Sequence, residues 1–310
     1  MRSAVRRAVA LLIGSLLLLA GCGGDQGEDL PQVSGKFGEK PTVTLPKGEP
    51  GKEFRVKTLI EGDGPEVKKG DILFAHLLLK RWQGDEELGA TYDSNQLYAT
   101  PAPIGTGQMP KALDEGLVGK KAGSRVLMVV PPEKGYGANP PQGSPIKPDD
   151  TLVFVVDVYG SYPPSASATG RPVGKTDPKL PTVQGQPGEK PTIKLPPGAA
   201  PKQLVSQVLV EGTGPEVKAG QFLIGQYVGV IWPGGKEFDA SWNRQQPAAF
   251  QIGTGQVIKG WDEGLVGKKT GSRVLLVIPP DKGYGTSGRP EVGIKGTDTL
   301  VFVVDILGSR

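Results

Sequence analysis

Residues 253–267 read GTGQVIKGWDEGLVG, and this stretch organises the second half of the chain. Ile258, Trp261 and Leu265 recur at i, i+3 and i+7, so they fall on one face of a helix. Gly267 follows them as a typical C-terminal signal. The pattern predicts a short helix of about two turns within residues 257–266.

Extended segments surround this helix on both sides. Each is rich in Val, Ile, Leu or aromatic residues and is bounded by Gly or Pro, which is typical of strands. They span residues 204–210, 221–232, 248–252, 273–279 and 299–307. No strand–helix–strand alternation appears, so we expect antiparallel strands that bury the apolar stripe of the helix on one sheet face, an α+β domain of two layers.

The same pattern occurs a second time in the chain. Residues 105–119 read GTGQMPKALDEGLVG, 148 positions before the first stretch, whereas EGDGPEVK at 61–68 and EGTGPEVK at 211–218 are offset by 150. A period this long predicts a duplicated domain and excludes a solenoid. We interpret the change of offset as a two-residue deletion in the first copy and place it after Asp93.

Length and composition agree with two domains joined by linkers. A chain of 310 residues is long enough for two ordinary domains, and its 47 glycines and 30 prolines predict many turns and some extended stretches. The expected organisation is a signal peptide at 1–21, a linker or stalk at 22–51, a degenerate domain at 52–160, a Pro/Gly-rich linker at 161–201 and a second domain at 202–310.

Composition also excludes several kinds of site. A formal charge of +4 without a basic run argues against nucleic acid as a partner. With Cys22 and His76 as the single cysteine and histidine, we expect no disulfide, no metal site and no cofactor, and covalent catalysis is disfavoured. His76 is predicted to be a packed or surface histidine.

The first residues have the pattern of an export signal. Arg2, Arg6 and Arg7 precede an apolar run at 8–20, which is short for a membrane span but suits a secretory signal. The run ends in LAGC at 19–22, which resembles the lipobox of bacterial lipoproteins, where the cysteine is lipid-modified. An ordinary signal peptide is the alternative. We expect lipidation at Cys22 and a membrane-anchored protein on the extracytoplasmic face of the cell membrane.

Five motifs follow one another in the second copy: QYVG at 226–229, EFDAS at 237–241, VIKGW at 257–261, PPDKGYG at 279–285 and TLVF at 299–302. Their order, which covers nearly all of residues 202–310, resembles the FKBP family of peptidyl-prolyl cis/trans isomerases. The resemblance implies a twisted antiparallel sheet wrapped around one short helix. It also implies a shallow apolar pocket between them that holds a proline.

The resemblance implies roles for single residues, with Trp261 as the pocket floor. The catalytic groups it implies are Tyr227, Asp239 and Tyr284. The substrate-binding residues it implies are Phe238, Arg244, Phe250, Val257, Ile258, Trp261, Ile294 and Phe302. A histidine that is usual in this family after the tyrosine is replaced by Arg289 or a neighbour. Taken singly, each aromatic residue is more often a core residue, but the set favours a site.

The first copy keeps this frame with a less complete pocket. We align Leu77 with Tyr227, Met109 and Pro110 with Val257 and Ile258, and Leu113 with Trp261. Tyr92-Asp93, Tyr136 and Phe154 are aligned with Phe238-Asp239, Tyr284 and Phe302, and no counterpart of Arg244 is expected. Weak or absent activity is predicted for this copy, whose expected role is to bind unfolded or proline-containing polypeptides without turnover or to act as a spacer.

These residue types suit isomerisation of X-Pro bonds. Amide resonance gives this bond a barrier of about 18–20 kcal/mol, and the twisted transition state has less charge separation, so a dry aromatic pocket disfavours the planar form more. The expected partners are proline-containing polypeptides among exported folding proteins, together with macrolide ligands. The alternatives are a non-catalytic module that binds peptides or a partner protein at the cell surface, and a structural spacer.

Overall fold

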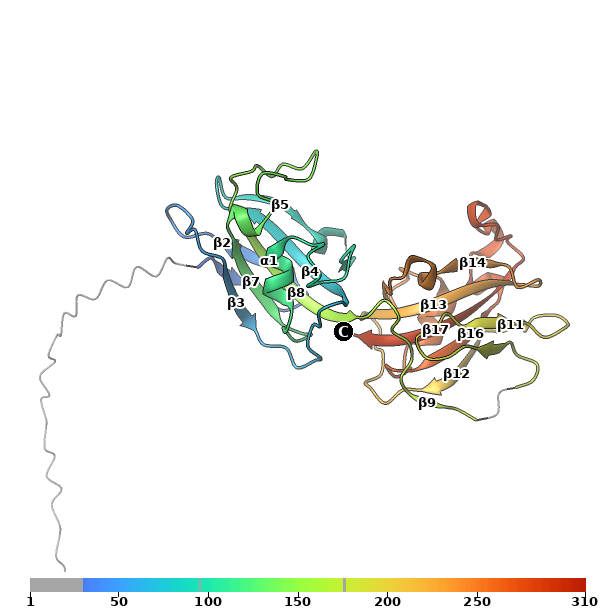
Figure 1. Ribbon diagram of the computed structural model, residues 1–310. Helices are drawn as coiled ribbons and strands as arrows, with labels where there is room; N and C mark the ends of the chain where they lie inside the picture. Colours follow the sequence, from blue (N-terminus) through green and yellow to red (C-terminus); the bar gives the residue numbers. More distant parts are fainter. Residues whose placement is uncertain (1–29, 95, 175–176) are drawn as a thin grey trace, which may run out of the picture.

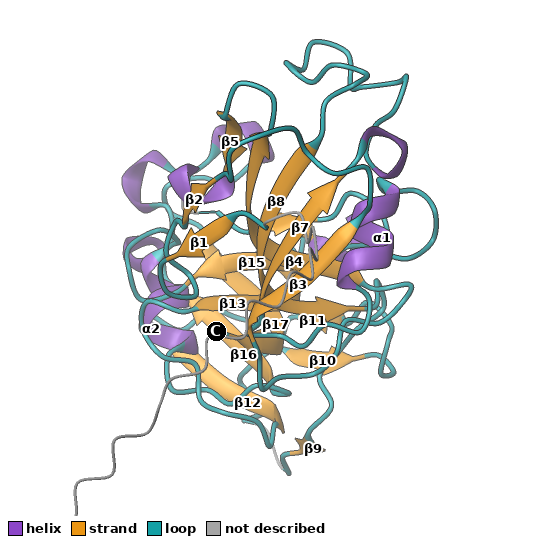
Figure 2. Cartoon of the chain, turned by 90° about the vertical axis from the view of Figure 1, so that its left-hand side faces the viewer, coloured by secondary structure: helices purple, strands orange, loops and turns teal. Residues whose placement is uncertain are grey.

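The computed structural model describes residues 30–94, 96–174 and 177–310, and the chain forms two sheet-based domains there (Figure 1). The predicted signal peptide and Cys22 lie outside the described residues. Within the described ranges, no helix has the length and apolar character needed to span a membrane. Strands form the sheet at the centre of each domain, and short helices flank the sheets (Figure 2).

The first domain is an antiparallel sheet with the strand order β3-β7-β8-β4-β5, and β6 also pairs with β4. Its elements are β3 (Arg55–Ile60), β4 (Ile72–Arg81), β5 (Glu86–Ala90), β6 (Tyr98–Ala99), α1 (Lys111–Leu117), β7 (Arg125–Val130) and β8 (Leu152–Tyr162). Helix α1 packs its buried face against β7, so that the main core lies between helix and sheet.

The second domain repeats this arrangement with the order β14-β13-β17-β16-β12-β9, and β15 pairs with β13. Its elements are β9 (Arg171–Pro172), β12 (Val205–Glu211), β13 (Phe222–Trp232), β14 (Glu237–Ala240), β15 (Ala248–Gln251), α2 (Lys259–Leu265), β16 (Arg273–Ile278) and β17 (Thr299–Ser309). The predicted α+β class, the long strands and the short helix are confirmed.

Glycine allows helix α2 to lie close to the sheet. A Cβ atom on Gly260 would come within 2.5 Å of Ile278, and one on Gly264 within 2.7 Å of Leu276. Contacts of this length are not sterically allowed, so larger residues would push the helix outward. The close approach buries Trp261 and Leu265, as the helical spacing predicts.

Strand pairing corrects the predicted position and direction of the two-residue difference between the copies. Ala99 pairs with Phe74 as Ala249 pairs with Ile224, so the offset of 150 continues to the end of this strand. Four residues then separate Ala99 from Ile104, whereas two separate Ala249 from Ile252. The first copy is therefore the longer one, and its extra residues lie in the segment 100–103 rather than being deleted after Asp93.

The segments predicted to be extended linkers contain hairpins that pack on the outer faces of the two sheets. These hairpins are β1 (Gln32–Ser34) with β2 (Thr42–Thr44), and β10 (Thr182–Gln184) with β11 (Thr192–Lys194). Val43 joins the outer core of the first domain, and Val183 and Ile193 pack on that of the second. These parts of the predicted linkers at 22–51 and 161–201 are therefore packed against the domains. Since both faces of the sheets are covered, strands such as β13 are buried along their whole length.

A buried arginine anchors the first hairpin to its sheet. Arg125 on β7 forms an ion pair with Asp157 on β8, with a distance of 2.7 Å between Nε and Oδ1. Its guanidinium also donates to the carbonyl oxygens of Gly35, Lys36 and Glu39 in the hairpin turn. The turn therefore closes over a charge that would otherwise be costly to bury.

Candidate functional site

A pocket of about 790 Å³ opens between helix α2 and the strands of the second domain. Nine of the residues predicted for the site line it: Tyr227, Phe238, Asp239, Phe250, Val257, Ile258, Trp261, Tyr284 and Phe302. They come from β13, β14, β15, the loop before α2, helix α2 itself, the loop after β16, and β17. The fold thus brings together residues that are far apart in the sequence.

Aromatic rings form the floor and walls of this pocket. The Trp261 ring lies 4.9 Å from that of Phe250, 5.3 Å from that of Phe302 and 5.6 Å from that of Tyr227, each in an edge-on arrangement. Phe238 meets Phe302 edge-on as well, at 5.4 Å. Edge-to-face packing of this kind fixes ring orientation and excludes water, so the pocket is preformed for an apolar ring.

A carboxylate in the helix holds the loop that carries Val257 and Ile258. Asp262 accepts hydrogen bonds from the backbone N–H groups of Gly253, at 2.6 Å, and Gly255, at 2.8 Å. Both glycines have positive φ angles, 78° and 77°, which favour glycine. The GTG sequence is therefore needed to return the chain to the pocket wall.

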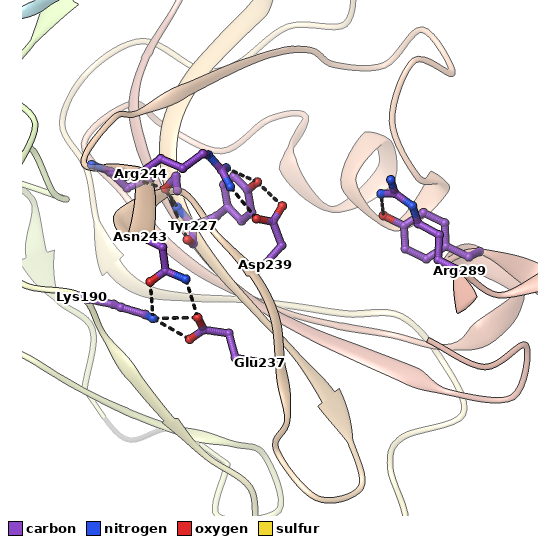
Figure 3. Close-up of polar contacts among 10 residues, drawn as sticks. Lys190, Tyr227, Glu237, Asp239, Asn243, Arg244 and Arg289 are labelled. Atoms are coloured by element: carbon purple, nitrogen blue, oxygen red, sulfur yellow. Dashed lines mark hydrogen bonds and ion pairs between the residues drawn. The ribbon is translucent and has the colours of Figure 1, made fainter. Parts of the chain in front are cut away.

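A three-residue polar network lies at the rim, where Tyr227, Asp239 and Arg244 meet (Figure 3). The Tyr227 hydroxyl group donates to Asp239 Oδ2. Arg244 donates to Asp239 Oδ1 from Nη1 at 2.7 Å and to Tyr227 Oη from Nη2 at 2.8 Å. Arg244 does not line the pocket itself but holds the two groups that do.

This network shifts the pKa values of its members apart. Burial, followed by the hydrogen bond to Asp239, raises the pKa of Tyr227 to about 12. Burial alone would raise the pKa of Asp239, but hydrogen bonds from Tyr227 and Arg244 outweigh it and hold that pKa below its usual value. Near neutral pH the pocket therefore has a neutral phenol beside a carboxylate charge.

The opposite rim consists of the loop after β16. Arg289 lies over the Tyr284 ring, 5.5 Å from its centroid, and its Nη1 lies 3.5 Å from Tyr284 Oη. Arg289 is thus the residue that stands beside the tyrosine in this loop. Ile294, predicted to be at the pocket wall, is instead buried in the core and holds this loop closed through two backbone hydrogen bonds with Arg289.

Sequence reasoning missed some of the lining residues. These are Gln256, Lys259, Gly283 and Val292. Gln256 lies just before Val257 and Ile258, and Lys259, the first residue of α2, lies just after them. Their place next to the predicted wall was the signal that could have found them. Val292 ends a 3₁₀ helix, Pro290–Val292, in a loop without apolar periodicity.

In the first domain, the rim network is missing at the equivalent positions. Leu79 pairs with Gly89 as Gly229 pairs with Asp239, so Leu88 and Gly89 stand where the second domain has Phe238 and Asp239. The predicted equivalence of Tyr92-Asp93 is wrong, because Tyr92 and Asp93 lie beyond this strand in a 3₁₀ helix. The same register places Ser94 at the position of Arg244 and Thr100 at that of Phe250.

His76 is packed, as predicted. It is buried in β4 and stacks on Tyr92 with ring centroids 4.6 Å apart, and its Nδ1 lies 2.9 Å from Thr91 Oγ1. Over the part of the chain that the structure describes, no three His, Cys, Asp or Glu residues gather closely enough to hold a metal ion.

Comparison with known proteins gives one consistent family. The model of the FKBP-type peptidyl-prolyl cis-trans isomerase family matches residues 64–159 and 214–307. An FK506-binding protein of Streptomyces anulatus is 46% identical over 119 residues, which cover 38% of this chain and 96% of that protein. A probable FK506-binding protein of Corynebacterium glutamicum is 42% identical over 123 residues, which cover 39% of this chain and 99% of that protein.

A solved structure is similar over the same extent. FkpA from Escherichia coli shares 42% identity, with 34% of this chain and 48% of that chain covered and a TM-score of 0.32. Each of these similarities spans about the length of one of the two matched segments.

Proposed function

The chain belongs to the FKBP-type peptidyl-prolyl cis-trans isomerase family, and we propose that its second domain is the active isomerase. One observation carries this proposal: the second domain has Tyr227, Asp239 and Arg244 joined at the pocket rim, where the first domain has Leu77, Gly89 and Ser94. The first domain is then weakly active or inactive.

The pocket accelerates rotation by favouring the twisted state of the X-Pro bond. A planar amide is stabilised by resonance with charge separation, which an apolar pocket solvates poorly. The twisted state has lost that resonance and is less polar. It therefore loses less solvation free energy than the planar state when the bond moves from water to a pocket formed by Trp261, Phe302 and Ile258. The proline ring would lie on Trp261, where the aromatic edges converge.

Polar groups at the two rims orient the substrate. Because Arg289 donates to Tyr284 Oη, the phenolic proton of Tyr284 stays available to a substrate carbonyl. Asp239 keeps Tyr227 in the wall and places an ionised carboxylate at the pocket edge. Each such interaction contributes about 1–3 kcal/mol to transition-state stabilisation.

We further propose that the protein acts outside the cell, where slow proline isomerisation limits the folding of exported chains. The LAGC sequence at 19–22 supports a lipid anchor at Cys22 and a place on the extracytoplasmic face of the membrane. Macrolides such as FK506 are proposed as ligands of the same pocket, since relatives of one-domain length are FK506-binding proteins.

The competing function is peptide binding without turnover. It is favoured by the first domain, whose equivalent positions keep Tyr136 and Phe154 but lack the charged rim. Such a domain would still present apolar surface to an extended chain. Both functions predict binding of proline-containing peptides, and they differ in whether the bound bond rotates faster.

A proline-isomerisation assay on the full chain, with Tyr284→Phe and the matched Tyr136→Phe, tests the proposal. Loss of one neutral hydrogen bond predicts a fall in kcat/KM of about 2- to 10-fold for Tyr284→Phe and no change for Tyr136→Phe. An unaltered chain that matches the uncatalysed rate on several X-Pro peptides would refute the enzyme. Macrolide binding without turnover would support the binding module instead.

A further inference from the structure

The two domains contact each other through the same patch of each copy. Ile72 and Phe74 begin β4 on the face of the sheet that points away from α1, and Phe222 and Ile224 are their equivalents on β13. All four side chains are at most 6% exposed and belong to one apolar cluster together with Tyr159. This cluster, called here the interdomain cluster, joins the two sheets where the end of β8 comes close to β17 (Figure 1).

Phe222 of the second domain contacts two aromatic rings of the first. Its ring lies edge-on to His76 and to Tyr159, with centroids 5.5 Å apart in both cases. These two rings belong to β4 and β8 of the first domain. A ring held on two sides by edge-on contacts has one orientation, so the interface has a defined geometry.

A hydrogen bond connects this interface to the loop of the pocket rim. Gln246 Nε2 donates to the backbone oxygen of Thr100 over 2.9 Å. Gln246 lies two residues after Arg244, which ends a short 3₁₀ helix, and the residue between them has a left-handed backbone with a φ angle of 51°. The loop that carries Arg244 is therefore held at one end by the first domain.

The acceptor of this bond is rigid. Thr100 is fully buried, its N–H donates to the carbonyl oxygen of Leu73, and its hydroxyl oxygen accepts from the N–H of Leu73. Thr100 stands in the first domain where the second has the pocket wall residue Phe250. The position that forms a wall in one copy serves in the other as an anchor for its neighbour.

We infer that the first domain supports the pocket of the second, with Gln246 as a positioning residue that acts through Arg244, and this rests on the proposed function of that pocket. Gln246 does not line the pocket, and its effect passes along the chain to the guanidinium that holds Asp239 and Tyr227. The first domain thus contributes to isomerisation without a complete pocket of its own.

The test uses the full chain with Gln246→Ala and a matched control, Gln96→Ala. Gln96 occupies the same position in the first copy and is exposed. Loss of the hydrogen bond is expected to lower kcat/KM on an X-Pro peptide by about 2- to 3-fold, no more than the loss for Arg244→Gln, whereas the control keeps the value of the unaltered chain. Gln246→Lys retains a donor and is expected to recover most of the loss.

A double-mutant cycle separates positioning from general destabilisation. In an Arg244→Gln background, Gln246→Ala is expected to have little further effect, because the group it positions is already gone. If Gln246→Ala lowered kcat/KM by the same factor with and without Arg244, the inference would be overturned. An unchanged kcat/KM for Gln246→Ala in an active protein would overturn it as well. The proposed function would stand in both cases.

Hydrogen exchange gives a readout that does not depend on activity. The Gln245 N–H, bonded to the Trp242 carbonyl oxygen, is expected to exchange faster in Gln246→Ala and at the original rate in Gln96→Ala. If the unaltered chain proved inactive, the proposed function would fail, and this exchange rate would still decide whether the first domain holds the loop. Equal exchange of the Gln245 N–H in both variants would show that the first domain does not hold the loop.

Discussion

Gly89 of the first domain occupies the sheet position that Asp239 occupies in the second. Gly89 pairs with Leu79 on β4, and Asp239 pairs with Gly229 on β13, at the same step of the same hairpin. One copy therefore has a carboxylate at the pocket edge, bound to Tyr227 and Arg244, where the other has a hydrogen atom. This difference is the physical basis for assigning different roles to two domains with the same fold.

We expect Arg244→Gln to lower kcat/KM by about 2- to 5-fold, because a half-exposed ion pair contributes little but its loss releases Asp239 and Tyr227 from one arrangement. The measurement is an X-Pro isomerisation assay on the full chain. The matched variant Ser94→Ala, at the equivalent position of the first copy, is expected to have no effect. Equal losses in both variants would contradict the role of the rim network.

The acid limb of the activity profile is expected to lie at unusually low pH. The folded pKa of Asp239 is depressed, so its charge and the stability from its ionised form are present above the unfolded value of about 3.9 and are lost as pH falls through the folded pKa. Activity should therefore stay level from neutral pH down past this unfolded value. In Arg244→Gln the pH at which activity falls on the acid side should move to a higher value. A profile that did not move would argue against the effect of Arg244 on the pKa of Asp239.

His76 is expected to remain neutral below its usual titration range. Burial lowers its pKa from 6.5, and the negative charge of Asp157, which is paired with Arg125, opposes this only in part. Because the chain has one histidine, its imidazole gives a single NMR titration curve. The stability that this neutral group contributes is present above pH 6.5 and is lost as pH falls through the folded pKa.

The same signal reports on the contact between the domains. Phe222→Ala opens His76 to solvent, so we expect its pKa to rise towards 6.5 and its ring-current shift to decrease. Phe238→Leu, in the same domain but away from the interdomain cluster, is expected to leave the His76 signal unchanged. An unaltered signal in Phe222→Ala would mean that the two domains do not meet at this face in solution.

Arg125→Ala is expected to lower the free energy of unfolding by about 3–5 kcal/mol, since it leaves the buried Asp157 carboxylate unpaired. The equivalent Arg273→Ala breaks the pair with Asp305 but leaves no hairpin carbonyls comparable to those of Gly35 and Lys36. Urea unfolding of both variants should therefore show the larger loss for Arg125→Ala. A larger loss for Arg273→Ala would contradict this role of the hairpin anchor.

The strands, the helix and the duplication could be predicted because they depend on local pattern. Apolar runs bounded by Gly and Pro, and one helical spacing around Trp261, are properties of short windows of sequence. The hairpins could not be found in this way. Their strands are three residues long. Both hairpins pack on an outer sheet face, and the first is also bound by Arg125, so they depend on contacts with residues far away in the sequence.

The pocket was predictable as a set of residues, and its equivalents in the first copy were not. Tyr92-Asp93 and Phe238-Asp239 are similar in sequence, whereas strand pairing places Leu88 and Gly89 at the position of Phe238-Asp239. Ile294 could not be separated from the lining residues by type, because an isoleucine suits a wall and a core equally. The hydrogen bond from Gln246 to Thr100 joins residues 146 positions apart and leaves no pattern in the sequence.

The most direct test of the central claim exchanges the pocket floors of the two domains. In the full chain, Trp261→Leu gives the second domain the residue found at the equivalent Leu113, and the measurement is kcat/KM on an X-Pro peptide alongside macrolide binding. For Trp261→Leu we predict that kcat/KM falls at least about 10-fold, equivalent to about 1.4 kcal/mol. The thermal unfolding midpoint shows whether the chain is folded. Leu113→Trp is expected to leave activity unaltered. A folded Trp261→Leu protein with full activity would contradict the assignment of isomerase activity to the second domain.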